Sequence, residues 1–207
     1  KQSSLKIDYE IKEILEQSLS IYEVKSELLK KLDPDVIITQ SQCSICAVSL
    51  TDVEKCLSKF INRKPLLIDL KPNTFEEVLN DINLVGKKLD KKLESYSLVK
   101  NIKNEINKIK LKTSKLKKKN VLCIEWIAPI MIAGNWVPEL VKFAGGKSVL
   151  AESGINSTFI ESNRINFKEF DIVIFMPCGF DVKKSRKEIL KANIDYSNIF
   201  KEKKNFY

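Results

Sequence analysis

Residues 91–117 read KKLESYSLVKNIKNEINKIKLKTSKLK, and this stretch decides the fold because it predicts one long helix in mid-chain. That helix would be roughly 40 Å long at ~1.5 Å per residue. Its stripe of mainly apolar positions spans about two and a half heptads, fewer than a stable coiled coil needs. We therefore expect an intramolecular helix across two lobes rather than a coiled-coil seam. The stripe repeats every three or four residues: Val99, Ile102, Ile106, Ile109, Thr113 and Leu116.

Short β-branched runs and amphipathic helices alternate on both sides of this helix. Parallel strands are the usual result of such alternation. We expect an α/β fold of two small Rossmann-like lobes with mainly parallel sheets, residues 1–89 and 120–207, joined by one long helix within 90–119. The predicted strands are residues 35–39, 64–69, 120–125 and 170–176, and the predicted helices are 51–60, 75–89, 137–143 and 183–191, with two short helices within 8–32.

The central segment carries all of the formal net charge of +9. Residues 91–119 contain eleven lysines and two glutamates, so the rest of the chain sums to zero. The segment has no arginine and one aromatic residue, Tyr96, whereas nucleic-acid surfaces usually combine cations with stacking aromatics or bidentate arginines. We interpret the lysines as a solvated helix face and expect no nucleic-acid partner. The alternative is a helical scaffold that binds acidic partners.

The absence of histidine excludes several kinds of active site. Ser-His-Asp and Cys-His nucleophile systems, and histidine-ligated zinc, cannot be assembled from this chain alone. We expect a protein that is not an enzyme and uses no catalytic cofactor. No window approaches the ~18 uninterrupted apolar residues of a membrane span, so we expect no membrane-spanning segment. The start, Lys1-Gln-Ser-Ser, lacks a methionine and an apolar signal core, so either a leader has been removed or the beginning is missing.

Three loops directly after predicted strands hold most of the unusual side chains. Residues 39–46, 125–139 and 176–181 include both tryptophans and three of the five cysteines. Loops at strand ends are where α/β proteins build binding sites. The clustering predicts a crevice that holds a ligand.

Several strings in these loops match a known family. They are Leu32-Asp-Pro-Asp-Val-Ile-Ile-Thr-Gln-Ser-Gln-Cys-Ser-Ile-Cys-Ala-Val-Ser49, Glu125-Trp126, Gly134-Asn-Trp-Val-Pro-Glu-Leu140, Gly145-Gly146 and Met176-Pro-Cys-Gly-Phe-Asp181. With these strings in this order, the chain resembles class III substrate-binding proteins of ABC importers, in particular their cobalamin-binding branch. The Leu-x-Pro-Asp sequence just before the first predicted strand is shared with siderophore and haem binders. This chain differs at position 135, commonly histidine in the branch, and its lobes look short at both termini.

The resemblance implies a corrinoid, such as cobalamin, held between the lobes for delivery to the importer. Trp126, Trp136 and Phe180 would offer rigid apolar faces to the flat ring. Amide side chains can donate and accept hydrogen bonds, which suits the amide-bearing rim of a corrinoid. These amides are Gln40, Gln42 and Asn135.

Three cysteines permit a sharper hypothesis. Cys43, Cys46 and Cys178 could form a thiolate cluster that holds a metal or touches cobalt, although structural zinc normally takes four ligands and no fourth is evident. Buried thiols or a redox pair are equally compatible with this spacing. We expect Cys43 and Cys178 to contact the ligand and expect no metal site. A cysteine-based metal or redox protein is the alternative from another class.

The resemblance also implies a partner and a compartment. Acidic residues on exposed helices of such proteins dock on arginines of the membrane permease, and Asp52, Glu54 and Glu139 are the candidates here. We expect a monomer that works in the periplasm or at the cell surface. A cytoplasmic protein that retains its ligand is the alternative.

Overall fold

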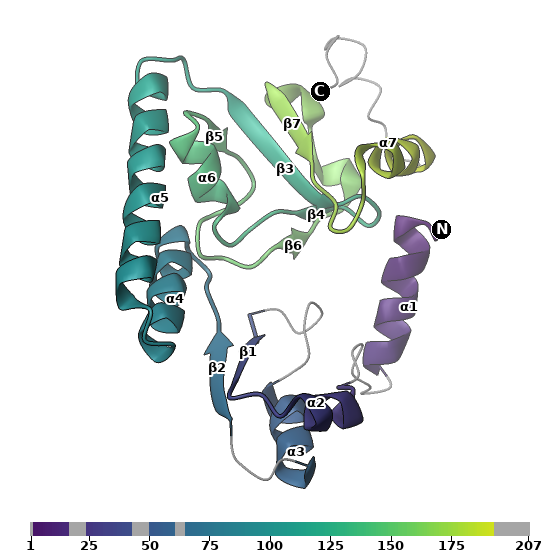
Figure 1. The fold of residues 1–207 in the computed structure, drawn as a ribbon. Helices are drawn as coiled ribbons and strands as arrows, with labels where there is room; N and C mark the ends of the chain where they lie inside the picture. The colour runs from purple at the N-terminus through teal and green to yellow at the C-terminus, as the bar shows by residue number, and fades with distance from the viewer. Residues whose placement is uncertain (1, 17–23, 43–49, 61–64, 193–207) are drawn as a thin grey trace.

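The computed structural model describes residues 2–16, 24–42, 50–60 and 65–192 (Figure 1). Two α/β lobes lie beside the long helix α5, as the sequence predicts. The chain begins with α1 (Ser4–Glu16), α2 (Ser26–Leu32), β1 (Val36–Gln40), α3 (Leu50–Phe60), β2 (Leu66–Leu70), α4 (Phe75–Lys88) and α5 (Lys92–Thr113). It continues with β3 (Asn120–Trp126), β4 (Met131–Ile132), α6 (Val137–Phe143), β5 (Lys147–Ser148), β6 (Thr158–Phe159), η1 (Ser162–Arg164), η2 (Phe167–Glu169), β7 (Ile172–Phe175) and α7 (Val182–Lys191).

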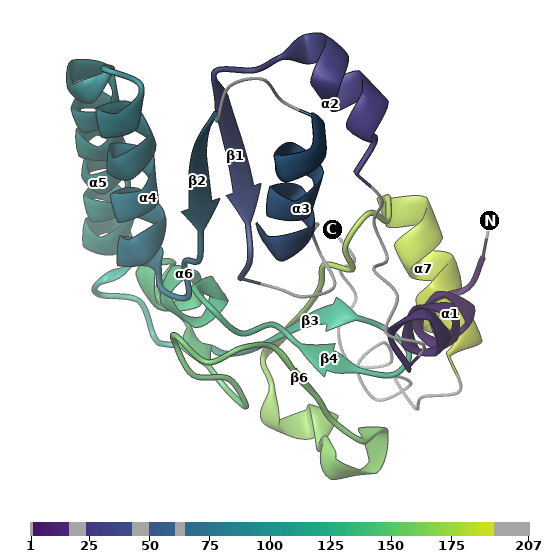
Figure 2. The ribbon, with the colours of Figure 1, turned by 90° about the horizontal axis from the view of Figure 1, so that it is seen from below.

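The first lobe is built on two parallel strands. β1 and β2 pair in register from Val36 opposite Leu66 to Gln40 opposite Leu70. Figure 2 shows α3 on one side of this pair and α4 and α5 on the other. Both strands point toward the second lobe in Figure 1, so residues 40–42 and 70–72 follow strand ends that face it.

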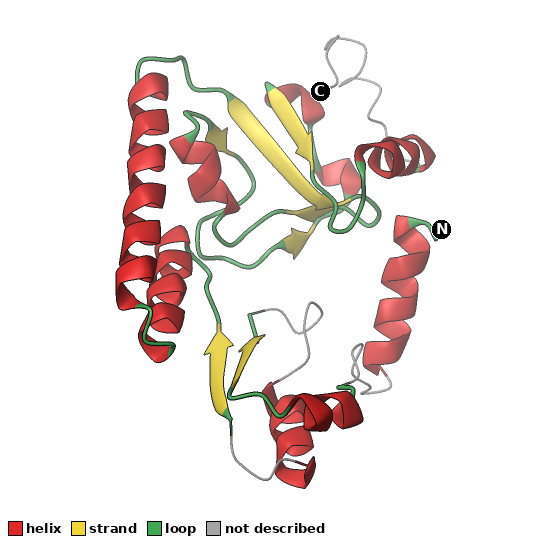
Figure 3. Ribbon diagram, in the orientation of Figure 1, coloured by secondary structure: helices red, strands yellow, loops and turns green. Residues whose placement is uncertain are grey.

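The second lobe has β3 at its centre. β3 pairs in parallel with β5 and β7 and antiparallel with β4, which in turn pairs with β6 (Figure 3). One face of β3 packs Leu122 and Ile124 into an apolar cluster, and the other face packs Val121 and Cys123 against α6. Since both faces are buried, the continuous apolar run of β3 is what a central strand requires.

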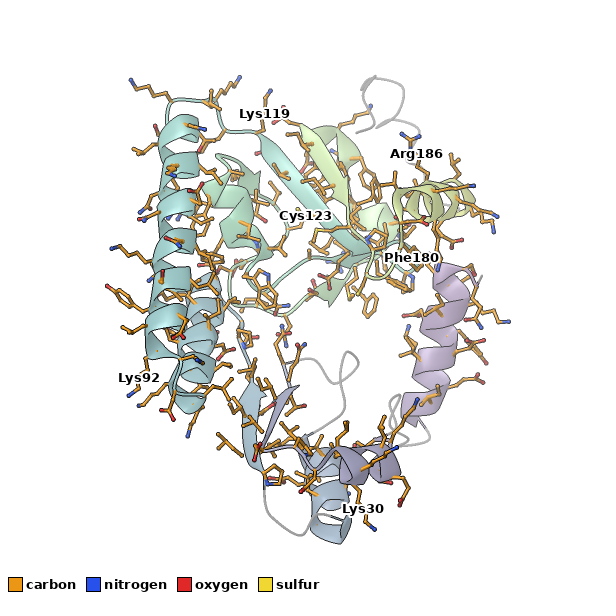
Figure 4. All side chains as sticks on the ribbon, in the orientation of Figure 1. Lys30, Lys92, Lys119, Cys123, Phe180 and Arg186 are labelled. Atoms are coloured by element: carbon orange, nitrogen blue, oxygen red, sulfur yellow. The ribbon has the colours of Figure 1, made fainter. Side chains whose placement is uncertain are left out.

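Helices α4 and α5 form an antiparallel hairpin that packs tightly at its turn. A Cβ at Gly86 would lie 2.2 Å from the Ser95 hydroxyl oxygen, so only glycine permits this approach. α5 ends at Thr113, four residues before the end of its lysine-rich pattern. Lys92 and Lys119 lie at opposite ends of this segment (Figure 4). Among the described helices, none combines the length and apolar character that a membrane crossing requires.

The prediction differs from the structure at the short strands and at the starts of two helices. The two-residue strands β4, β5 and β6 were not expected. β4 pairs antiparallel with both β3 and β6, whereas mainly parallel pairing was predicted. Thr51, followed by Glu54 three residues later, fits the sequence pattern of a helix cap, but α3 already begins at Leu50. The capping box that the structure does form lies at α4, where the Thr74 side chain accepts from the Glu77 amide and the Glu77 side chain accepts from the Thr74 amide.

Candidate functional site

Two predicted aromatic residues meet although 54 positions separate them. Trp126 is the last residue of β3, and Phe180 lies in the loop between β7 and α7; their ring centroids are 5.3 Å apart at 53°. The Lys184 ammonium lies 3.5 Å from the Phe180 ring centroid on the ring's face. Figure 4 shows Phe180 beside α7, near the start of α1. β3 and β7 are parallel neighbours, so the carboxyl end of the sheet places the two rings together.

The Trp126 indole has an unused hydrogen-bond donor. Its Nε1–H is buried and has no partner within the described chain. Buried donors in folded proteins almost always have a partner, and an unpaired one costs about 1–3 kcal/mol. An unpaired indole N–H at the end of a central strand is therefore a candidate ligand contact.

Asn135 has the complementary unused acceptor. Its backbone adopts φ 52°, a left-handed conformation that asparagine tolerates better than most residues. This conformation is fixed on both sides, because the Asn135 N–H donates to Ile155 O at 2.6 Å and its carbonyl accepts from the Gly154 N–H at 3.0 Å. The Asn135 Oδ1 is buried without a partner. Trp136 follows at the start of α6 and is half-buried.

Glu125 is a polar residue of this region that we did not predict as a site residue. It precedes Trp126 on β3, and burial raises the pKa of its carboxyl, while a hydrogen bond from Ser157 acts in the opposite direction. The Ser157 Oγ also accepts the Gly134 N–H at 2.9 Å. Ser157 therefore links Glu125 to the turn that carries Asn135. The sequence did offer one signal for this residue, because a carboxylate stands directly before a tryptophan at the end of a predicted strand.

The first lobe presents polar groups at its strand ends. Gln40 is exposed and Gln42 half-buried, and Ser41 between them donates to Asp69 Oδ2 at 2.6 Å. The Lys71 ammonium lies 3.3 Å from the same oxygen. Asp69 Oδ1 is buried and unpaired. The two glutamines thus lie beside an anchored Ser–Asp–Lys group that faces the second lobe.

The cysteine predictions are only partly covered by the structure. Cys43 and Cys46 lie outside the described residues. Cys178 is exposed, Cys56 half-buried and Cys123 buried, and burial raises the pKa of the Cys123 thiol to about 11. Within the ranges that the structure describes, no group of three metal-binding side chains occurs.

The three predicted docking acids have different environments. Glu54 is exposed and Asp52 half-buried on α3. Glu139 is half-buried on α6, and its carboxylate accepts a hydrogen bond from the Phe75 backbone N–H at 2.6 Å. This carboxylate is thus engaged with the amino-terminal end of α4, and its docking role stays a prediction.

A hollow of about 530 Å³ lies in the second lobe beside this region. Its volume is in the range of small-molecule sites. None of the predicted ligand-binding side chains lines it, so it does not by itself mark the predicted crevice. Its walls come from β4 and the segment between β5 and β6: Ile132, Gly134, Ser148, Val149, Leu150, Ala151, Glu152, Ile155, Asn156 and Thr158.

Solved structures share this architecture. An ABC transporter substrate-binding protein from Listeria monocytogenes matches with a TM-score of 0.63 at 18% identity, over 86% of this chain and 64% of that one. Staphylococcus aureus IsdE complexed with heme gives 0.59 at 24%, over 86% and 68%. The periplasmic vitamin B12 binding protein BtuF of Vibrio cholerae gives 0.55 at 12%, over 82% and 66%. These likenesses establish the fold.

The chain therefore spans less than two thirds of the length of the Listeria protein. A comparison with curated protein sequences gave no match. A sequence profile described as periplasmic binding protein matches residues 16–199, which include both lobes and the long helix between them. This chain belongs to the periplasmic binding protein family.

Proposed function

We propose that this chain is a non-catalytic solute-binding component of an ABC importer and that it holds a cobalamin-like corrinoid between its lobes. The observation that carries the proposal is the pair of unused groups on the second lobe, the Trp126 Nε1–H and the Asn135 Oδ1. One is a donor and the other an acceptor. A primary carboxamide can satisfy both kinds of group, and carboxamides surround the corrin ring.

The aromatic pair supports the same class of ligand. Trp126 and Phe180 provide rigid apolar surface at low cost in side-chain entropy, which suits a broad flat ring. Gln40 and Gln42 would add amides from the opposite lobe.

Haem is the second candidate, and Lys184 is the observation that favours it. Its ammonium lies against Phe180 and could pair with a propionate at the edge of the same aromatic surface. A siderophore binder is a further member of the same class. The three ligands differ in charge and in hydrogen-bond donors, so parallel titrations separate them.

The test is calorimetric titration with cyanocobalamin, haemin and a ferric hydroxamate. We expect saturable binding of cyanocobalamin that weakens in Trp136→Ala and in Phe180→Leu. Tyr96→Ala, on the exposed side of α5, is the matched control for loss of an aromatic ring and should bind as the unmodified chain does. Saturable binding of haemin with no binding of cyanocobalamin would mean that the ligand is haem and not a corrinoid.

The importer partner follows from the same proposal. Asp52 and Glu54 on α3 would dock on permease arginines, and the protein would act in the periplasm or at the cell surface. Charge reversal at Glu54, which is exposed, should reduce ligand-dependent stimulation of the importer's ATPase without changing ligand affinity. An equal loss of ligand affinity would show that the residue acts on the site rather than on docking.

A further inference from the structure

The corner at which α5 ends and the chain turns into β3 concentrates positive charge. Residues 110–119 contain six lysines and no acidic residue. Figure 1 shows this connection at the end of the molecule away from the first lobe, and Figure 4 labels Lys119 there. Two exposed lysines of the second lobe, Lys142 and Lys147, flank the turn between α6 and β5 beside it. We refer to residues 110–119 as the lysine corner.

Most of the charge in the lysine corner is not neutralised by a neighbour. Lys119 forms an ion pair with Asp171 at 3.4 Å, and the Lys110 ammonium lies 4.0 Å from the Phe143 ring centroid. Within the part of the chain that the structure describes, the other four lysine side chains are exposed and have no ion pair, hydrogen bond or aromatic contact: Lys112, Lys115, Lys117 and Lys118.

The helix dipole explains only some of these lysines. Lys110 and Lys112 lie in the last turn of α5, where the unpaired carbonyl groups favour a cation. α5 ends at Thr113, and the effect falls off beyond the last turn, so it does not explain Lys115, Lys117 and Lys118. Like charges this close along the chain repel one another and destabilise the compact state. The clustering therefore points to a partner that supplies negative charge.

The lysine corner is anchored to the second lobe at both ends. A Cβ at Gly145 would lie 2.6 Å from the Thr113 Cβ, so the end of α5 lies directly against the turn after α6. At the other end, the Lys147 N–H donates to Lys119 O at 2.8 Å. The lysines between these two points are therefore presented on one fixed surface of the lobe.

Two leucines stand exposed among the lysines. Leu111 is 76% exposed and Leu116 is 62% exposed. Leu116 lies in the turn that follows the helix, where its N–H donates to Thr113 O at 3.0 Å. Lysines around exposed apolar side chains suit the surface of an anionic bilayer, because the headgroups attract the charges and the interface accepts the apolar groups.

A nucleic acid fits this surface less well. Residues 110–119 contain no arginine and no aromatic residue, which nucleic-acid surfaces use for bidentate contacts and for stacking. Duplex backbone binding is electrostatic, so the exposed leucines would add nothing to it. The combination of unpaired lysines with leucines therefore favours a lipid surface.

We propose that the lysine corner binds the surface of an anionic lipid bilayer. The four unpaired lysines lie against the headgroup phosphates, and Leu111 and Leu116 enter the interface. Lys142 and Lys147 extend the charged surface on the second lobe. The contact is peripheral, since α5 packs its apolar stripe on the protein and only its carboxyl end meets the lipid. This inference does not depend on the ligand assignment.

The test is co-sedimentation of the ligand-free chain with vesicles. We expect binding to vesicles of equal parts phosphatidylglycerol and phosphatidylcholine, and binding at least about tenfold weaker to pure phosphatidylcholine. Salt at ~1 M, where the Debye length is about 3 Å, should abolish binding to the anionic vesicles. Equal binding to both kinds of vesicle, or binding to neither, would overturn the proposal.

Variants that remove charge locate the contact. The triple variant Lys115→Gln, Lys117→Gln and Lys118→Gln should lower the partition coefficient on anionic vesicles about 100-fold, because each lysine contributes about fivefold. The control removes three exposed lysines from α7 and should lower the coefficient less than about threefold. Equal losses in the two variants would mean that net charge and not the lysine corner determines binding. The control substitutions are Lys183→Gln, Lys187→Gln and Lys191→Gln.

A variant of the two leucines separates a bilayer from a soluble polyanion. The double variant Leu111→Ser and Leu116→Ser should bind anionic vesicles about tenfold more weakly but bind duplex DNA as the unmodified chain does. Unchanged binding to the vesicles would refute insertion of the leucines. Tighter binding of the unmodified chain to duplex DNA or to polyglutamate than to the vesicles, at equal concentrations of negative charge, would assign the corner to a nucleic acid or to an acidic protein.

Discussion

The two lobes differ in how deeply their sheets are buried. In the second lobe, Leu122 and Ile124 of β3 are 0% exposed. In the first lobe, Ile68 of β2 is 3% exposed, but Ile38 in the middle of β1 is 48% exposed. The second lobe is thus a packed scaffold that fixes Trp126, Asn135 and Phe180, whereas the first lobe presents its glutamines from a less covered sheet.

Core truncation should expose this difference most strongly. We expect Ile124→Ala to reduce the free energy of unfolding by about 2–5 kcal/mol, because it leaves a cavity in a fully buried cluster. Ile38→Ala should cost less than about 1 kcal/mol, because the side chain is half exposed already. Urea unfolding followed by circular dichroism and by fluorescence gives both values, and the fluorescence reports the second lobe, which contains both tryptophans. Equal costs would contradict the comparison.

The attachment of α1 to the second lobe should have the next largest effect. Glu188→Ala removes a buried carboxylate acceptor from the Ser4 N–H and should cost about 1.5–3 kcal/mol. Lys187→Ala, at the exposed neighbouring position on α7, is the control and should change stability by less than about 0.5 kcal/mol. Thermal unfolding of both variants measures the difference. Similar melting temperatures would mean that α1 is not held at this point.

Much of the fold could be predicted because its signals are local. The three- and four-residue spacing that begins at Val99 predicted α5, and the predicted helix at 137–143 coincides with α6. Two-residue strands such as β4 and β6 could not be found, since two positions show no periodicity. Thr51 with Glu54 and Thr74 with Glu77 fit the same capping pattern, and only the structure shows that the second pair is used.

The site was less predictable because its contacts join distant positions. Trp126 and Phe180 were both expected at a ligand crevice, but the contact between their rings depends on the pairing of β3 with β7. The bond between Glu139 and Phe75 depends on how α4 lies against α6, which no local pattern encodes. The link from Ser157 to Gly134 likewise joins positions 23 residues apart.

Ligand affinity should distinguish the more buried side of the proposed site, at Trp126, from the more exposed side, at Gln40. Trp126→Phe keeps an aromatic ring and removes the unpaired Nε1–H, so we expect the Kd for cyanocobalamin to rise about three- to tenfold, the effect of one lost hydrogen bond. Gln40→Ala should raise the Kd less, because the exposed Gln40 side chain forms hydrogen bonds with water when the ligand is absent. Calorimetry on both variants gives the ratio. A larger effect at Gln40 would assign the dominant contacts to the first lobe.

The smallest expected effect concerns the pH dependence of stability at Glu125. Burial raises the pKa of its carboxyl above the ordinary value of 4.5, so the folded state binds the proton more tightly than the unfolded state. The stabilisation from this group is therefore complete below pH 4.5 and is lost as the pH rises through the folded-state pKa. Glu125→Gln carries no titrating group here, so its stability relative to the unmodified chain should increase over that range. Urea unfolding from pH 4 to 7 measures how the free energy of unfolding changes with pH in each variant. Glu161→Gln, at an exposed position, is the control for the lost charge. Parallel pH profiles for the unmodified chain and Glu125→Gln would show that the Glu125 carboxyl is solvated as in the unfolded chain.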